Sequence, residues 1–166
     1  PKKGLLMLIE AWARVRPGGW LLQIAGPDEA GHRGEVEKAV SAAGLGEVVS
    51  FVGPVDGQTK ESVFFDANLF VLPTLQEALG TSILEAAAMK KAVVAFRTGG
   101  VDEVVVDGVT GILVEPSDTG ALAKAIIRLL KDAPLRQRMG QEGRRLVEKN
   151  YSNDAMVDGM RYLYVE

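Results

Sequence analysis

Apolar residues recur along the chain with two different periods, and these two patterns alternate from one end to the other. Leu5, Leu8, Ile9, Trp12 and Val15 follow helical spacing and predict a first helix over residues 4–16. Residues 20–25 form a short, mostly apolar run between turns rich in glycine and proline, which is typical of a buried strand. The same criteria predict strands at residues 48–52, 69–72, 93–96 and 112–114, and helices at residues 33–43, 58–65, 81–89, 102–106, 119–131 and 134–150, with a helical tail after Ser152.

The predicted strands are mostly apolar, and each is separated from the next by a helix. Strands of this kind are buried on both faces, as in parallel sheets with right-handed helical crossovers. The pattern therefore predicts an α/β fold: a Rossmann-like, doubly wound parallel sheet flanked by helices, in one domain over residues 1–166. Such a domain usually begins with its central strand, whereas this pattern begins with a helix. We therefore expect the first strand to be missing and its position to be open or filled by another segment.

Composition narrows the class of protein further. The formal net charge is -3, from 19 basic and 22 acidic residues, which argues against non-specific nucleic-acid binding. Cysteine is absent, so disulfides and thiolate metal sites are excluded and the reducing cytoplasm is the expected location. No run approaches the roughly 18 apolar residues of a membrane span, so no transmembrane segment is predicted. The first residues resemble neither a signal peptide nor a native start.

The most suggestive polar residues follow the predicted strand at residues 69–72. In open parallel sheets, ligands bind at the carboxyl ends of strands, close to helix N-termini. Glu77 lies in the expected loop, residues 80–82 begin the next helix, and Glu85 lies about one turn into it. Free amides of that first turn would attract a diphosphate, and a carboxylate suits the two hydroxyls of a ribose. Taken alone, two glutamates eight positions apart are more often solvated charges, so both interpretations stay open.

The sequence around these glutamates, EALGTSILEAAAMKKAVVAFRTGGVDEVVVDGVTGILVEPSD, resembles the C-terminal domain signature of glycosyltransferase family 4, in the GT-B class. That signature pairs two glutamates separated by seven residues and continues with Gly-Gly, Asp-Gly and Pro-x-Asp. Upstream, Lys3-Gly4 and residues 51–53 resemble two further motifs of the family, so the similarity covers essentially the whole chain. The positions in register are Glu77, Gly80, Glu85-Ala86, Val93-Val94, Gly99-Gly100, Glu103, Asp107-Gly108, Gly111 and Pro116-Ser117-Asp118.

The resemblance implies a retaining glycosyltransferase of polysaccharide biosynthesis. Such an enzyme moves a hexose-type sugar from a nucleotide-diphosphate sugar to a glycan or lipid acceptor, without a metal or other cofactor. By this resemblance Lys3 and Glu77 are the expected catalytic residues: Lys3 would neutralise the leaving diphosphate and Glu77 would face the transferred sugar. The remaining donor-binding residues would be Gly80, Thr81 and Ser82 for phosphate or sugar hydroxyls, Glu85 for the ribose, and Gly53 and Val55 near the nucleobase.

The chain also departs from the family pattern. The family has an arginine ahead of Lys3, as a second cation for the diphosphate, and an N-terminal domain that binds the acceptor. Both lie outside this sequence, so we expect the 166-residue chain to be inactive alone. Leu79 stands where the family usually has phenylalanine, and residues 90–92 replace a usual Gly-Pro turn. In the full-length enzyme, peripheral association with a membrane is a further expectation.

Two other interpretations stay open. The chain could be a non-catalytic, truncated module that self-associates as a homodimer through an open sheet edge. It could also be a GT-B-like sugar-nucleotide epimerase, although that group does not usually carry this glutamate spacing. Walker and G-x-G-x-x-G motifs are absent, and the single His32 lies in a glycine-flanked loop that we expect at the surface. Arg97 follows a predicted strand and faces the ligand edge. The nucleobase, the sugar and the acceptor do not follow from the fold.

Overall fold

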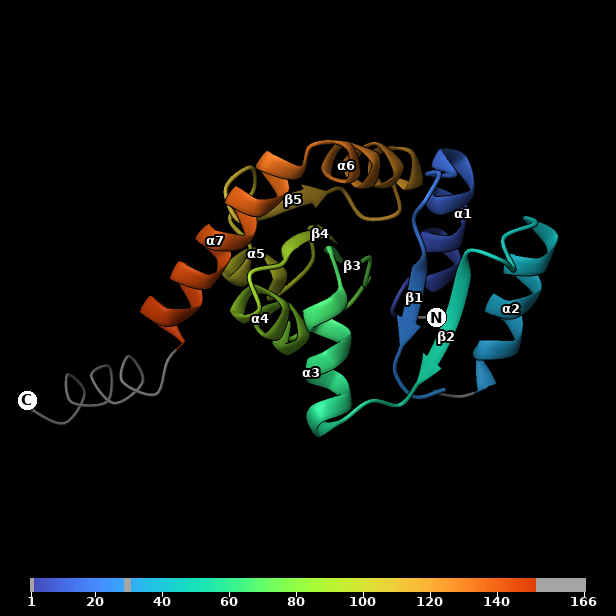
Figure 1. Cartoon of the computed structure of the whole chain (residues 1–166), viewed down its shortest axis with the longest axis horizontal. Helices are drawn as coiled ribbons and strands as arrows, with labels where there is room; N and C mark the ends of the chain where they lie inside the picture. Colours follow the sequence, from blue (N-terminus) through green and yellow to red (C-terminus); the bar gives the residue numbers. More distant parts are fainter. Residues whose placement is uncertain (1, 29–30, 152–166) are drawn as a thin grey trace, which may run out of the picture.

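The computed structural model describes residues 2–28 and 31–151, and every predicted helix and strand in that range is present (Figure 1). The observed ends differ from the predicted ones by two residues at most. The predicted helical tail after Ser152 lies outside the described residues. The elements are α1 (Leu5–Val15), β1 (Leu22–Ala25), α2 (Arg33–Ala42), β2 (Val49–Gly53), α3 (Gly57–Asp66), β3 (Leu69–Leu72), α4 (Thr81–Ala88), β4 (Ala92–Phe96), α5 (Val101–Val104), β5 (Gly111–Val114), α6 (Thr119–Lys131) and α7 (Ala133–Asn150).

The strands form two parallel sheets rather than one. β1 pairs with β2, while β3, β4 and β5 form a second sheet in that order. β1 and β3 are the strands that face each other across the gap in Figure 1, but no strand pairing joins them within residues 2–28 and 31–151. The central strand of a doubly wound sheet would occupy this position. The fold class is confirmed, and among the described residues no strand occupies the position between β1 and β3, which we call the slot.

The strand β4 is covered on both faces. Ala92, Val94 and Phe96 belong to the larger core, which α6 and α7 help to form. Val93 and Ala95 point to the opposite face and pack in a second core with residues of α4 and α5. All five residues of β4 are buried, as expected for the continuously apolar strands of an α/β sheet.

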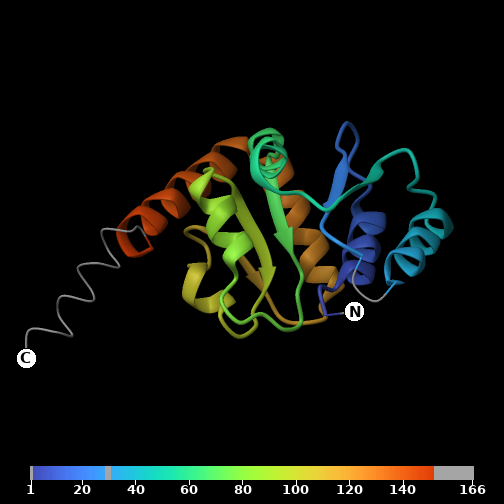
Figure 2. The ribbon, with the colours of Figure 1, turned by 90° about the horizontal axis from the view of Figure 1, so that it is seen from below.

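The molecule has two halves, one with β1 and β2 and one with β3, β4 and β5, and helices α1 and α6 connect them. α6 lies between the larger sheet and α1, and α1 packs against both α6 and α2 (Figure 2). The two long C-terminal helices begin at aspartate N-caps: Asp118 accepts a hydrogen bond from the Ala121 amide at 2.8 Å, and Asp132 accepts one from the Leu135 amide at 2.9 Å. Where α1 packs against α6, Glu10 of α1 accepts a hydrogen bond from the hydroxyl of Thr119, the first residue of α6, at 3.0 Å.

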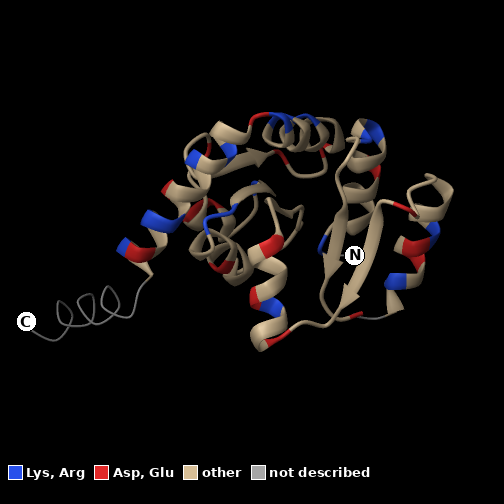
Figure 3. Ribbon diagram, in the orientation of Figure 1, with Lys and Arg blue, Asp and Glu red and all other residues tan. Residues whose placement is uncertain are grey.

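Basic and acidic residues are interspersed along α2 and α7, whereas the charged residues of α6 are all basic (Figure 3). None of the helices in the described part of the chain is long and apolar enough to cross a bilayer.

Candidate functional site

The two predicted catalytic residues meet at the carboxyl end of β3. Lys3 Nζ donates a hydrogen bond to the Glu77 carboxylate at 3.0 Å, although 74 positions separate them in sequence. The segment before α1 is held there because the Lys2 carbonyl accepts hydrogen bonds from the Leu75 amide at 2.8 Å and the Thr74 hydroxyl at 3.2 Å. The Glu77 side chain is 16% exposed and that of Lys3 is 52% exposed. The carboxylate is therefore held in the loop, while the ammonium group remains accessible.

The N-terminus of α4 lies directly after this loop. Gly80, the N-cap residue, has φ 67°, a left-handed conformation that glycine adopts at no steric cost. None of the described side chains caps this helix, so the amides of Thr81 and Ser82 face outward at its positive end. Main-chain amides at a helix N-terminus bind anions such as phosphate. Lys3 contacts the loop that leads into this helix, where its ammonium group is paired with the Glu77 carboxylate. The helix N-terminus therefore suits an anionic group, and Lys3 could contact that group if it left Glu77.

Glu85 forms an ion pair with Lys60, a residue that no sequence motif indicated. Its carboxylate accepts a hydrogen bond from Lys60 Nζ of α3 at 2.6 Å, and the two side chains are 42% and 37% exposed. An exposed ion pair of this kind contributes only about 0.2–1 kcal/mol, so a ligand can share or replace it at small cost. No motif marks Lys60, because its role depends on how α3 packs beside α4.

Gly53 and Val55 lie at the carboxyl end of β2, in the smaller sheet. Gly53 ends that strand, and its carbonyl accepts a hydrogen bond from the Gly26 amide at 2.8 Å. Val55 is partly exposed in the loop that leads into α3, the helix that carries Lys60. The predicted site therefore spans both sheets, and α3 connects its two parts.

Arg97 follows β4 at the ligand edge, but carboxylates surround its guanidinium group. It lies 3.0 Å from Asp107, 3.5 Å from Glu115 and 3.7 Å from Asp102. Asp107 also accepts a hydrogen bond from the Leu113 amide at 2.9 Å, which fixes it beside β5. These contacts give Arg97 a structural role at this edge and balance its charge locally.

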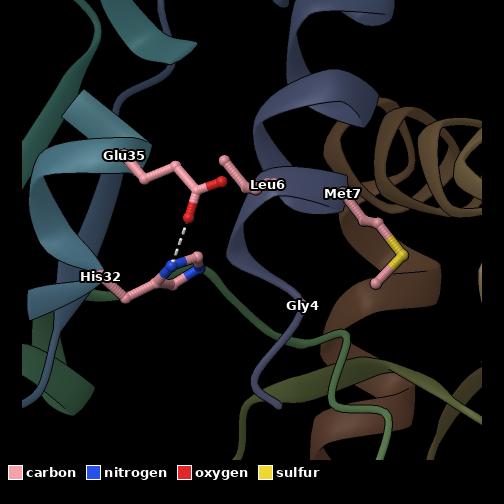
Figure 4. Close-up of a pocket in the computed structure, with 5 residues that line it drawn as sticks. All are labelled: Gly4, Leu6, Met7, His32 and Glu35. Carbon is pink, nitrogen blue, oxygen red and sulfur yellow. Dashed lines mark ion pairs between the residues drawn. The ribbon is translucent and has the colours of Figure 1, made fainter. Parts of the chain in front are cut away.

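His32 does not lie on the surface as predicted. Its side chain is 14% exposed, and Nδ1 lies 2.8 Å from the Glu35 carboxylate. The two residues line a cavity of about 290 Å³ together with Gly4, Leu6 and Met7 (Figure 4). The prediction was wrong because α2 begins directly after His32 and packs against α1, which covers the imidazole. The cavity reaches Gly4 and so adjoins Lys3.

Across residues 2–28 and 31–151, no three His, Asp or Glu side chains gather in a way that could hold a metal ion. Metal independence of the reaction stays a prediction.

Comparison with known proteins gives consistent matches. The family described as glycosyl transferases group 1 matches residues 1–146. The alpha-D-kanosaminyltransferase of Streptomyces kanamyceticus is 34% identical over 165 residues, which are 99% of this chain and 43% of that protein. Sucrose-phosphate synthase from Thermosynechococcus elongatus superposes with a TM-score of 0.87 at 32% identity, over 98% of this chain and 42% of the other.

A third match extends the fold to a liganded structure. Anabaena HepE, solved in complex with UDP and glucose, superposes with a TM-score of 0.87 over 98% of this chain and 46% of the other. At 24% identity this likeness concerns the fold alone. The chain spans less than half the length of each of these three proteins.

Proposed function

Because the chain belongs to the glycosyl transferases group 1 family, we propose that it binds the nucleotide-diphosphate sugar of a retaining glycosyltransferase. In this proposal a hexose-type sugar passes from the donor to a glycan or lipid acceptor. The acceptor is held by an N-terminal domain, as suggested by relatives more than twice as long as this chain. The enzyme works in the cytoplasm, with the full-length protein peripheral to a membrane, and uses no metal or other cofactor.

The observation that carries the proposal is the meeting of Lys3, Glu77 and the uncapped N-terminus of α4 at one sheet edge. A donor diphosphate bound at the amides of Thr81 and Ser82 lies close to the exposed Lys3 ammonium group. Lys3 then turns from Glu77 to the diphosphate, where it stabilises the charge that develops on the leaving group. Glu77, released from this ion pair, accepts hydroxyl hydrogen bonds from the transferred sugar.

The second part of the proposal concerns the nucleoside. The Glu85 carboxylate accepts hydrogen bonds from the two ribose hydroxyls, a geometry that suits its two oxygens. Lys60 either shares one oxygen or moves away, because the exposed pair contributes little free energy. The base then lies toward Gly53 and Val55, which border the site on the side of β2. The UDP and glucose bound by HepE, which has the same fold, are consistent with a donor of this class.

Calorimetric titration of the chain with UDP, GDP and ADP tests the proposal, with the variant Glu85→Ala measured in parallel. We expect one nucleotide to bind and the substitution to weaken it at least tenfold, which is about 1.4 kcal/mol. The matched control is Glu61→Ala, which removes an exposed carboxylate from α3 and is expected to leave the affinity unchanged. Failure of all three nucleotides to bind would refute donor binding by this chain.

The unpaired edges of β1 and β3 favour a second candidate: a non-catalytic module that self-associates. Strand edges without partners pair readily with another chain, so two copies could fill each other's slots as a homodimer. Light scattering at tens of micromolar, combined with the calorimetric titration, separates the candidates. A dimer that binds no nucleotide would support the second candidate, whereas a monomer that binds one would support the first.

A further inference from the structure

We propose that Gly99 and Gly100 are positioning residues that hold the Glu77 loop and thereby set how the site discriminates the sugar of the donor. This inference rests on the proposed function, because Glu77 is taken to contact the transferred sugar. Neither glycine touches a ligand in the proposal. They act through the main chain of residues 77–79, whose backbone atoms lie directly against both glycines.

Two hydrogen bonds join the loop after β4 to the loop after β3, one between backbone atoms and one from a side chain. The Gly100 amide donates a hydrogen bond to the Glu77 carbonyl at 3.1 Å, and the Thr98 hydroxyl donates one to the Thr74 carbonyl at 3.2 Å. The loop after β3 is therefore held at two of its residues, Thr74 and Glu77.

The second reason to assign a positioning role to these glycines is that a side chain has no room at either position. A Cβ added to Gly100 would lie 2.7 Å from the Ala78 carbonyl carbon and closer still to its oxygen. A Cβ on Gly99 would overlap the Glu77 carbonyl oxygen in the same way. A side chain at either position must displace the two loops relative to each other, because the obstructing atoms are backbone and not the end of a flexible side chain.

Gly100 offers a clean test of space alone. Its φ is -68° and its ψ is -1°, so an alanine there adopts an ordinary right-handed backbone. Gly99 has φ 43°, and a substitution there would combine steric overlap with backbone strain. The effect of Gly100→Ala can therefore be assigned to displacement of the loop.

The same segment also supports the start of α4. Val104, in the short helix that follows Gly100, has its Cγ2 atom 3.2 Å from the position that a Cβ of Gly80 would take. Residues 99–104 thus contact both the Glu77 loop and the N-terminus of α4. Lys3 contacts the Glu77 carboxylate as well. A shift of the loop changes the distance between the sugar contact at Glu77 and the diphosphate contact at α4. Discrimination of the sugar should therefore change more than affinity for the diphosphate.

The experiment compares the dissociation constants of UDP and UDP-glucose for the wild type and Gly100→Ala. GDP and GDP-mannose, or ADP and ADP-glucose, replace them if the calorimetric titration selects guanosine or adenosine. We expect Gly100→Ala to change the ratio of the two constants at least fivefold, with a smaller change for the nucleotide alone. Thr98→Val, which removes only the hydrogen bond to Thr74, should change the ratio in the same direction but less, and Thr98→Ser should restore it.

Gly140→Ala is the matched control for loss of stability. A Cβ on Gly140 would lie 2.6 Å from the Lys90 carbonyl carbon, an overlap as severe as that at Gly100, but at the far end of α4. Gly34→Ala, where a Cβ would meet no atom within 4 Å, is the mild control. Both controls should leave the ratio within twofold of the wild type. An unchanged ratio in Gly100→Ala, with nucleotide binding intact in the wild type, would overturn the inference alone.

A ligand-free measurement keeps the two proposals distinguishable. A crystal structure of Gly100→Ala should show the Glu77 carboxylate moved beyond ion-pair distance of Lys3, whereas Gly140→Ala should keep the 3.0 Å contact. A Gly100→Ala structure with the loop unmoved would overturn the positioning role, whatever the chain binds. Failure of the wild type to bind any nucleotide would instead refute the proposed function, and with it the role in sugar discrimination.

Discussion

The strands β3 and β4 have equally apolar sequences but different surroundings. The residues of β4, Ala92–Phe96, are all buried, because β3 and β5 pair with its two edges and helices cover both faces. The residues of β3, Leu69–Leu72, are all partly exposed, and β4 is the strand that pairs with it. A run such as Leu-Phe-Val-Leu is typical of a strand with neighbours on both sides. The comparison indicates that β3, unlike β4, has one edge without a strand partner among the described residues.

Substitution of the phenylalanine in each strand should show the largest difference in unfolding free energy. Phe96 of β4 is fully buried in the larger core, so Phe96→Ala should lower the free energy of unfolding by about 3–5 kcal/mol. Phe70 of β3 is partly exposed and packs on Phe64, with ring centroids 5.6 Å apart. Phe70→Ala should therefore have less than half of that effect. Urea denaturation measures both variants, and equal losses would contradict the contrast between the strands.

Amide hydrogen exchange provides a second test without any substitution. Alternate amides of a parallel strand point to opposite neighbours, so those of β3 that point toward the slot lack a strand partner. We expect them to exchange at least about 100-fold faster than the amides of β4, which open only with the whole domain. Protection that rises with protein concentration would indicate that a second copy fills the slot. Uniform protection of β3 at low concentration would contradict an open slot.

The smallest expected effect on stability concerns Glu10, which joins α1 to α6. The hydrogen bond from Arg14 holds the pKa of Glu10 below its ordinary value, and the hydrogen bond from Thr119 of α6 adds to this. A lowered pKa in the folded state means that ionised Glu10 stabilises the fold at neutral pH. This stabilisation is lost as the pH falls below the unfolded-state value of about 4.3 and through the lowered one.

Glu10→Gln measures this contribution. Because Glu10 is half exposed, the variant should lose only about 0.2–0.5 kcal/mol of unfolding free energy at pH 7. The difference from the wild type should shrink as the pH falls below about 4. Thermal unfolding as a function of pH provides the measurement, and a difference that grows toward acid pH would show that the sign is wrong.

Much of the fold could be predicted from the sequence, because glycine and proline mark the ends of nearly every element. The continuous apolar runs at residues 69–72 and 93–96 gave the strands, and the resemblance to family 4 gave the positions of Glu77, Gly80 and Glu85. The membership of the chain in glycosyl transferases group 1 and its GT-B fold are confirmed by the comparisons. Local signals were sufficient for these features.

What could not be predicted depends on packing between distant segments. The division into two sheets follows from which strands find partners, and periodicity carries no information on pairing. The Lys60–Glu85 contact depends on α3 lying beside α4, and His32 is only 14% exposed because α2 packs on α1. The three carboxylates around Arg97 come from three segments after β4.

A crystal structure of the chain with the nucleotide that it binds in calorimetry would test the central claim most directly. The account predicts the diphosphate at the amides of Thr81 and Ser82 with Lys3 beside it, and the ribose hydroxyls on Glu85. A diphosphate bound away from the amides of Thr81 and Ser82, for example in the cavity lined by His32, would contradict it.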